Sequence, residues 1–518
     1  MAVPVKKSLR MDPDVSGYRR ALSFRDLLMI SISGVVGSGW LFGSYYAAKD
    51  AGPSSLLAWL LGGGIILLGA SVNAELVGMF PRAGGSMRYP LYSHGSFVGF
   101  MVAWASWIPG AAGAATESAA VMQYASSYIP SLFHAGTLTG LGIGGAAFLV
   151  MTFSYINYLG IQWFARINTP LTFIKLVVPA VTVIILLATS FHAHNLDNPA
   201  WGGFMPDHVK GIFVALATSG IVYAYLGSSG PIELAAEAKD PQRQIPRVLF
   251  WVVGLSVALY TLLQLAFLGA VPAHLLNAGG WGALHFSSPF ANLLIAVNLV
   301  WFSYILYGDA VLSPSGAGLT GTAVNSRILY ALGLEQWMPQ SLAVVDKKRG
   351  VPVRALLTNS AVSLIFLLPF PSWQEMVGII VTSALILRIV LPVSLGVLRK
   401  TAADHSRPFK LPALSVLAPL ATVFSSLIIY WVGWPTTGLV MIFFAIGLIL
   451  YVVRRRGRWP VKDLRHGIWL IWQLGFLTAM SAVGSYGGLN WIPAPWDSLL
   501  VAADSVAVWY WGVSSGKP

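Results

Sequence analysis

Long apolar stretches recur along almost the whole of this 518-residue chain, and they limit what it can fold into. A helix needs about 20 mostly apolar residues to cross a bilayer. Such stretches lie near 26–46, 54–79, 94–127, 139–160, 169–191, 208–230, 246–271, 289–312, 356–372, 375–398, 413–432 and 436–453, and two more follow at about 466–484 and 496–513. The last is short and is interrupted by Asp504. The pattern predicts an all-α integral membrane protein with twelve transmembrane helices plus an extra pair, its outer faces in contact with membrane lipid.

Charged residues are too few to cover the surface of a soluble protein. They make up 10% of the chain, whereas about 25% is usual for soluble domains. This composition excludes an ordinary soluble enzyme, a disordered chain and a nucleic-acid-binding domain. Because there is no cysteine, neither disulfide bonds nor thiolate metal sites can form. No HExxH, GxSxG or P-loop motif occurs, so we expect no enzymatic activity, no metal and no cofactor.

Basic residues concentrate in alternate loops between these stretches. Most of the 32 Lys and Arg residues follow this alternation, whereas the opposite loops hold only Lys49 and Lys210. Loops rich in Lys and Arg stay on the cytoplasmic side of a membrane. The first 25 residues are polar and basic and show no cleavable signal peptide. We therefore expect residues 1–25 to form a cytoplasmic tail of a multi-pass protein in the cell inner (cytoplasmic) membrane.

Two of the predicted helices contain residues that interrupt a helix. The first carries Gly34, Gly37 and Gly39 at mid-membrane depth, and the sixth, over 219–233, carries Gly227, Gly230 and Pro231. Glycine in a helix interior costs about 1 kcal/mol relative to alanine, and unwound backbone at this depth must line a protein cavity. The alternative is a small-residue packing face of the GxxxG kind.

Interrupted helices in corresponding positions of two halves are typical of inverted-repeat secondary transporters. The sequence thus predicts a transport core over 26–398 with two five-helix inverted repeats, at about 26–191 and 208–398, and broken helices 1 and 6. Helices 11 and 12 would occupy 399–453. The remainder, 454–518, would be an extension with one or two further spans.

Several short motifs in register resemble the amino acid–polyamine–organocation transporter superfamily. They are Gly37-Ser38-Gly39, Ala74-Glu75-Leu76, Pro81-Arg82-Ala83-Gly84-Gly85, the run from Ala236 to Pro246, Ser326-Arg327-Ile328-Leu329-Tyr330-Ala331 followed by Met338-Pro339, and Arg407-Pro408-Phe409-Lys410. Within that superfamily, three details look like the bacterial aspartate–proton symporter-like amino acid permeases: Tyr225-Leu226-Gly227 with the following 231–235, the run 309–316, and the extra pair of spans. The chain departs from that group at Ser228-Ser229-Gly230, so this resemblance leaves the substrate open.

The resemblance implies a substrate site made largely of backbone. The α-carboxylate of an amino acid would meet the amides of Gly37, Ser38 and Gly39, because free N–H groups at a helix start bind anions. The α-ammonium would meet carbonyls near Val35 and Leu226, the latter preceding Gly227. Tyr223 would cover the substrate, as an aromatic residue does in the family.

Three ionisable residues at membrane depth are candidates for further roles. Lys175 in helix 5 stands where proton-coupled members of the family have a lysine in place of a sodium ion. The alternative interpretation is a structural lysine whose side chain reaches the cytoplasmic face. Asp309 in helix 8 either has a functional role, in which it carries a proton or pairs with Lys175, or stabilises a backbone end freed by Pro314. For Glu117 in helix 3 we favour a structural role.

Other charged residues have simpler expected roles. Glu75 and Glu237 would form salt bridges beside Arg82 and Arg243 at the cytoplasmic ends of their helices. Arg388 in helix 10 either faces the cavity or binds lipid.

The resulting hypothesis is secondary active transport of amino acids, by proton-coupled symport with alternating access, with an acidic amino acid among the candidate substrates. Its alternatives are an amino acid or amine exchanger without net proton coupling, a transporter-like membrane sensor, a channel and a membrane enzyme. The substrate, the coupling ratio and the oligomeric state stay open at this point.

Overall fold

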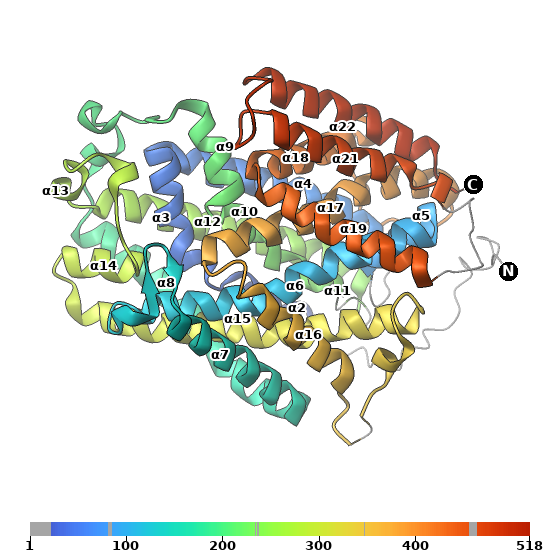
Figure 1. Ribbon diagram of the computed structural model, residues 1–518, viewed down its shortest axis with the longest axis horizontal. Helices are drawn as coiled ribbons and strands as arrows, with labels where there is room; N and C mark the ends of the chain where they lie inside the picture. Colours follow the sequence, from blue (N-terminus) through green and yellow to red (C-terminus); the bar gives the residue numbers. More distant parts are fainter. Residues whose placement is uncertain are drawn as a thin grey trace.

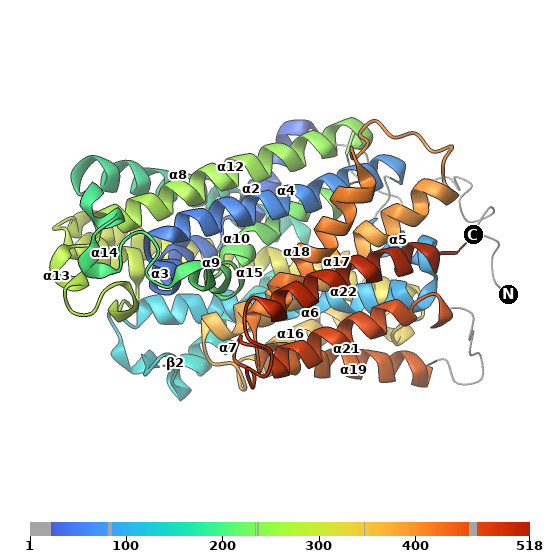
Figure 2. The ribbon, with the colours of Figure 1, turned by 90° about the horizontal axis from the view of Figure 1, so that it is seen from above.

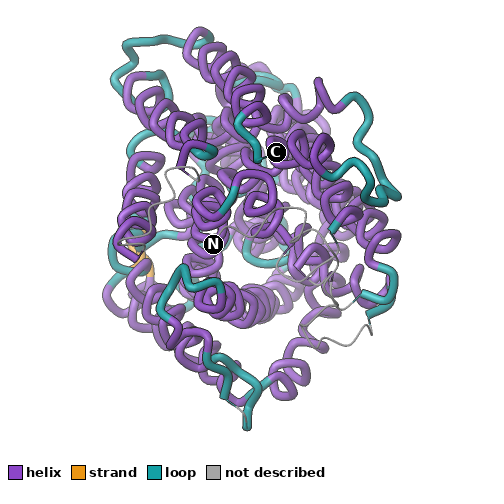
Figure 3. Tube along the Cα trace, turned by 90° about the vertical axis from the view of Figure 1, so that its right-hand side faces the viewer, coloured by secondary structure: helices purple, strands orange, loops and turns teal. Residues whose placement is uncertain are grey.

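The computed structural model describes residues 22–80, 85–233, 235, 238–346, 348–454 and 464–517. Within these ranges the chain is mostly helical, with one two-stranded antiparallel sheet, β1 (Phe133–His134) and β2 (Thr137–Leu138). The helices run roughly along the long axis of the molecule. One end holds α13 and α14, and the other holds α5 and the C-terminus (Figure 1). Figure 3, seen from the second end, shows the bundle end-on.

The α-helices are α2 (Phe24–Val35), α3 (Gly39–Ala51), α4 (Ser55–Met79), α5 (Gly85–His94), α6 (Ser96–Ala125), α7 (Gly140–Leu159), α8 (Ile161–Thr189), α9 (His208–Thr218), α10 (Ile221–Leu226), α11 (Gly230–Glu233), α12 (Pro241–Ala270), α13 (Ala273–Leu276), α14 (Pro289–Ala296), α15 (Val300–Leu334), α16 (Val353–Phe366), α17 (Trp373–Thr401), α18 (Leu414–Val432), α19 (Thr436–Arg454), α21 (Ile468–Val483) and α22 (Trp496–Ser514). Short 3-10 turns are η1 (Gly52–Ser54), η2 (Pro130–Leu132), η3 (Ala193–Leu196), η4 (Pro199–Trp201), η5 (Gly227–Ser229), η7 (Trp281–Ala283) and η8 (Gln340–Ala343).

Each apolar stretch predicted from the sequence contains a helix, but not every helix is long enough to span a membrane unaided. By length and composition, the described residues hold 8 candidate spans, or up to 9 if a bent pair is one span. This is fewer than the sequence predicts, because the segment Gly39–Met79 contains both α3 and α4, because α16 and α21 are short, and because neither α15 nor α22 is among the candidate spans. The stretch expected at 289–312 is divided into α14 and α15, and α15 continues to Leu334.

The predicted interruption of the first apolar stretch is present. A capping box at Ser23 and Asp26 starts α2, because each of these residues satisfies a free backbone N–H of the other. The helix ends at Val35, and α3 begins at Gly39. Residues 36–38 therefore form a gap between two half-helices.

The sixth stretch is interrupted at a different place from the one expected. The sequence located the break at Gly227–Pro231, and η5 does lie there, but the 46° bend falls earlier, between His208–Thr218 and Ile221–Ile232. Gly220 at this bend has φ 89°, a left-handed conformation that favours glycine. Pro231 is the second residue of α11, a position where its missing N–H costs no helical hydrogen bond.

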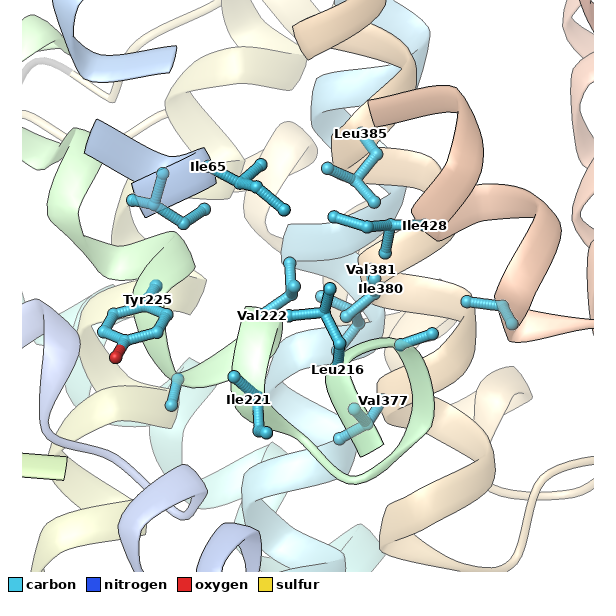
Figure 4. Packing of buried hydrophobic residues seen from close by; sticks show 14 of the residues in the cluster. Ile65, Leu216, Ile221, Val222, Tyr225, Val377, Ile380, Val381, Leu385 and Ile428 are labelled. Carbon is cyan, nitrogen blue, oxygen red and sulfur yellow. The ribbon is translucent and has the colours of Figure 1, made fainter. Parts of the chain in front are cut away.

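Apolar packing holds the broken helix against its neighbours. Ile221 and Val222 of α10 lie beside Val377 and Val381 of α17, in a buried cluster that also includes Ile428 of α18 (Figure 4). On one side of the bundle, α21 packs against α19 and α22, and α22 also packs on α18 (Figure 2).

Candidate functional site

The two interruptions meet in the interior of the bundle. A Cβ atom added to Gly227 of η5 would lie 2.1 Å from the carbonyl oxygen of Gly34 and 2.7 Å from the backbone nitrogen of Val35. Real Cβ atoms do not approach backbone this closely, so only glycine allows the two segments to touch. The GxxxG alternative describes this contact in part, because small residues do let the backbones approach, but the helices themselves are interrupted here.

A buried carboxylate occupies the gap in the first broken helix. Glu117 of α6 accepts a hydrogen bond from the backbone N–H of Ser38, with 3.0 Å between N and Oε2. The hydroxyl of Tyr223 donates to the other carboxylate oxygen at 2.7 Å. We expected a structural role for Glu117, yet its carboxylate lies against the amide predicted to hold a substrate carboxylate. This position makes Glu117 a candidate functional residue.

An aromatic wall closes the same gap. The indole N–H of Trp373 donates to the Ser38 hydroxyl at 2.7 Å. The Trp373 ring lies edge-on to the Tyr223 ring, with 5.8 Å between the ring centres. Gly39 faces Tyr223 and Ala224, since its Cβ would lie 3.0 Å from the Ala224 Cβ and 3.4 Å from the Tyr223 ring. The structure thus brings Ser38, Gly39 and Tyr223 together.

The carbonyls expected to receive an ammonium already have donors. The Val35 carbonyl accepts hydrogen bonds from the Tyr260 hydroxyl at 3.0 Å and from the Gly37 N–H at 3.1 Å. That of Leu226 accepts from the Ser229 hydroxyl at 3.0 Å. Because a carbonyl has two lone pairs, a substrate ammonium at Val35 would have to displace one of these donors.

Lys175 of α8 is bonded to the broken helix. Its ammonium donates to the carbonyl of Ser33 at 2.8 Å, and the side chain is 1% exposed. The Ser33 hydroxyl also lies 3.1 Å from that of Thr172 on α8. The alternative of a lysine that reaches the cytoplasmic face is wrong, because this ammonium is buried beside α2.

Asp309 of α15 is a second buried carboxyl near the gap. Its Oδ1 accepts from the Ser313 hydroxyl at 2.9 Å, and its Oδ2 has no hydrogen-bond partner among the described residues. Helix α15 continues through Pro314, so Asp309 caps no helix end there. Lys175 interacts electrostatically with Asp309 and Glu117, although the part of the chain that is described shows no ion pair between them within 4.0 Å. Two carboxyl groups thus interact with one ammonium.

Glu75 forms salt bridges, as expected, and its partners among the described residues are Arg399 and Arg407. Its fully buried carboxylate forms an ion pair with Arg399 at the end of α17, lies 3.6 Å from the Arg407 side chain and accepts from the Leu411 N–H at 2.8 Å. This cluster joins α4 to the loop before α18. Arg82 lies outside the described residues, as do Pro81, Ala83 and Gly84, Leu234, Ala236 and Glu237, residues 1–21 of the N-terminal tail and 455–463 of the C-terminal extension. Arg388 lies beside Gly69 of α4.

An apolar helical bundle in which two interrupted helices meet at buried polar groups is an arrangement typical of membrane transporters. The sequence profile described as amino acid permease matches residues 22–453, so the chain belongs to this family of multi-pass helical membrane proteins, which transport amino acids and are not enzymes. The resemblance drawn from the sequence motifs is thereby confirmed.

Three curated bacterial relatives show how far the similarity extends. The chain is 38% identical to the glutamate/serine transporter AimA of Bacillus subtilis (strain 168) over 512 residues, which covers 96% of this chain and 94% of that protein. It is 34% identical to the aspartate-proton symporter of the same strain over 514 residues, 97% of each chain. The branched-chain amino acid permease BcaP, also of this strain, is 25% identical over 453 residues, 85% of this chain and 93% of BcaP.

Proposed function

We propose that this permease is a proton-coupled amino acid symporter of the cytoplasmic membrane that works by alternating access. Its N terminus faces the cytoplasm, and twelve spans are followed by an extra pair. Residues 26–398 form the transport core, with inverted repeats at about 26–191 and 208–398, while 399–453 hold helices 11 and 12 and 454–518 the extension. Two relatives support this proposal by name, one a proton symporter of aspartate and the other a transporter of glutamate and serine.

The observation that carries the proposal is the carboxylate of Glu117 on the Ser38 amide. This amide belongs to the start of α3, where the partial positive charge of a helix N-terminus favours an anion. A substrate α-carboxylate would seek the amides of Ser38 and Gly39 for the same reason, and that of Gly37 only after it leaves the Val35 carbonyl. Substrate and Glu117 therefore compete for one anion site, with Tyr223 covering whichever carboxylate is bound.

Proton coupling follows from this competition and from the charges around it. A proton on Glu117 removes the charge that holds it to the amide, so substrate binding and protonation favour one another. Lys175 links the charge of the site to α2, because it bonds to the Ser33 carbonyl two residues before Val35. Asp309, with one free oxygen, is a second proton carrier. Gly227 keeps the other broken helix in contact with this centre.

The substrate is an α-amino acid, since the predicted site holds the groups common to all of them. Glutamate, aspartate and serine are the first to test, because they occur in the names of the relatives. Proteoliposomes with an alkaline interior should accumulate one of these amino acids, and a protonophore should abolish the accumulation. Uptake that occurs only against preloaded substrate would instead identify an exchanger. Fluxes far above the rates of alternating access would identify a channel, and binding without accumulation would identify a sensor.

Lys175→Ala tests the coupling residue. We expect this variant to lose accumulation driven by a pH gradient while it remains folded, because the ammonium that links the carboxyl groups to α2 is gone. Lys400→Ala, which removes an exposed ammonium at the end of α17, is the matched control and should transport normally. Unaltered proton-driven uptake by Lys175→Ala would remove Lys175 from the mechanism.

Gly39→Val tests the anion site. The added side chain would start 3.0 Å from the Cβ of Ala224 and extend toward Tyr223, so substrate should no longer reach the amides. Gly64→Val is the control, because a Cβ at Gly64 meets nothing within 4 Å. Normal substrate affinity in Gly39→Val would contradict a backbone carboxylate site.

A further inference from the structure

Two buried polar atoms beside the gap in the first broken helix are available to a substrate. They are the indole Nε1 of Trp40, in the first turn of α3, and the Oδ2 oxygen of Asp309 on α15. Both side chains are 1% exposed, and neither atom has a hydrogen-bond partner among the described residues. Because it is costly to leave a buried donor or acceptor unpaired, a ligand that satisfies both atoms gains affinity.

Neighbouring contacts bring these two atoms to the same place. The Tyr124 hydroxyl of α6 donates to the carbonyl of Leu41, the residue after Trp40, at 3.1 Å. The Tyr124 ring lies edge-on to that of Tyr307, two residues before Asp309, with 6.3 Å between the ring centres. The Trp40 indole and the Asp309 carboxyl interact, although the geometry between them is not that of a hydrogen bond. A donor on α3 and an acceptor on α15 therefore face each other.

This pair lies next to the amides proposed to hold the α-carboxylate of the substrate. Trp40 directly follows Ser38 and Gly39, and each Cα–Cβ bond of an α-helix is tilted toward the N-terminus. The Trp40 side chain therefore leans toward those amides rather than away from them. A Cβ at Gly37 would lie 3.2 Å from the Cβ of Ala317, so α15 forms one wall of the same gap. The side chain of an amino acid held by the amides can thus reach the pair.

We propose that Trp40 and Asp309 form the subsite for the side chain of the substrate, and that this subsite selects a hydroxyl group. The inference rests on the transport function proposed above and adds the substrate class, which is α-amino acids with a short hydroxyl-bearing side chain. The hydroxyl accepts a hydrogen bond from the Trp40 N–H and donates one to Oδ2 of Asp309. L-Serine is the simplest amino acid that can make both bonds.

A proton on Asp309 decides between a hydroxyl and a carboxylate. Among the described residues, the ionisable groups that interact with Asp309 are Lys175 of α8 and Tyr124 of α6, and Glu117 acts on the same ammonium. A hydroxyl both donates and accepts, so it bonds to Asp309 whether or not the carboxyl holds a proton. A carboxylate side chain would be repelled by the ionised form. The hydroxyl is therefore the group that fits throughout a cycle in which Asp309 gains and loses a proton.

Equilibrium binding of L-serine and L-alanine to the purified full-length protein tests the subsite, because these amino acids differ only in the hydroxyl group. We expect the wild type to bind L-serine on the order of tenfold more tightly, the effect of a hydrogen bond to a charged group. Trp40→Phe keeps an aromatic ring without the N–H, and Asp309→Leu removes the acceptor at similar volume. Each variant should lose most of the preference for L-serine while it still binds L-alanine.

Trp509→Phe is the matched control, because it removes another buried indole N–H that has no partner among the described residues, from α22. This variant should keep the preference. The two affinities are compared within each variant, so a general loss of stability does not imitate a loss of preference.

The subsite is overturned if the wild type binds both amino acids equally, or if Trp40→Phe or Asp309→Leu keeps the full wild-type preference. It is also overturned if L-glutamate binds to the wild type and L-serine does not, a result that leaves the proposed transport function standing. Absence of binding for every amino acid would instead refute the proposed function itself.

Discussion

Gly227→Ala perturbs the contact between the two broken helices by a single methyl group. The new Cβ would lie 2.1 Å from the Gly34 oxygen and 2.4 Å from its carbon, whereas ordinary contacts begin at 3.4 Å. The obstructing atoms are backbone, so no side chain can rotate away, and α2 and η5 must separate by more than 1 Å. Overpacking a well-packed interior costs about 1–3 kcal/mol, and misplacing a binding group by about 1 Å can cost on the order of 100-fold in rate.

Uptake into proteoliposomes and thermal unfolding measure these two effects separately. We expect Gly227→Ala to lose on the order of 100-fold in initial uptake and to unfold at a lower temperature than the wild type. Gly230→Ala, three residues further along, is the matched control, because its Cβ meets nothing within 4 Å. Wild-type uptake and stability in Gly227→Ala would refute the direct contact of the two breaks, since no other feature of the site could absorb the methyl group.

Three further substitutions test other parts of the argument. Glu117→Gln keeps the shape of the side chain but not its charge, so substrate binding to purified protein should lose most of its dependence on pH; an unchanged pH profile would exclude Glu117 as a proton carrier. Glu75→Gln should lower the free energy of unfolding by about 3–5 kcal/mol, because it leaves Arg399 without its buried partner, and unchanged denaturant unfolding would contradict this. Backbone N–H groups of Arg349 and Lys348 donate to Asp346 and lower the pKa of its carboxyl from 3.8. The contribution of the Asp346 carboxylate to the stability of the loop is therefore present at neutral pH and is lost as pH falls through the lowered pKa. Asp346→Asn should therefore speed amide hydrogen exchange at residues 348–350 at neutral pH, and equal exchange rates would rule the loop contacts out.

The helices and the first break were predictable because their causes are local. Apolar stretches of membrane length determine where helices form, and three glycines within six residues interrupt one of them wherever it packs. The bend in the sixth stretch was harder to place. Gly220 and Gly227 look alike in the sequence, and only the ring of Trp373 against Gly220 and the backbone of Gly34 against Gly227 distinguish their roles.

The polar centre was less predictable, because it depends on which helices meet. Lys175 and Asp309 could be selected as charges at membrane depth, but nothing in the sequence shows that Lys175 bonds to Ser33 rather than to Asp309. Glu117 was undervalued for the same reason. A glutamate among small residues in α6 gives no sign that the Ser38 amide and the Tyr223 hydroxyl converge on it.

The sequence predicts the C-terminal pair of helices but not the tertiary contacts that they make. The permease profile ends at residue 453, but the alignment with the aspartate-proton symporter leaves only a few per cent of the chain uncovered, so it must include most of 454–518. In the structure, the loop between α21 and α22 reaches α9, where the Lys210 ammonium lies 5.5 Å from the centre of the Tyr486 ring. Phe213 of α9 also stacks on Trp431 of α18 at 4.0 Å, and α18 packs against α22. The extra pair therefore supports α9, the first part of the bent helix pair, and a chain cut after residue 453 would leave α9 without its contact to the loop between α21 and α22.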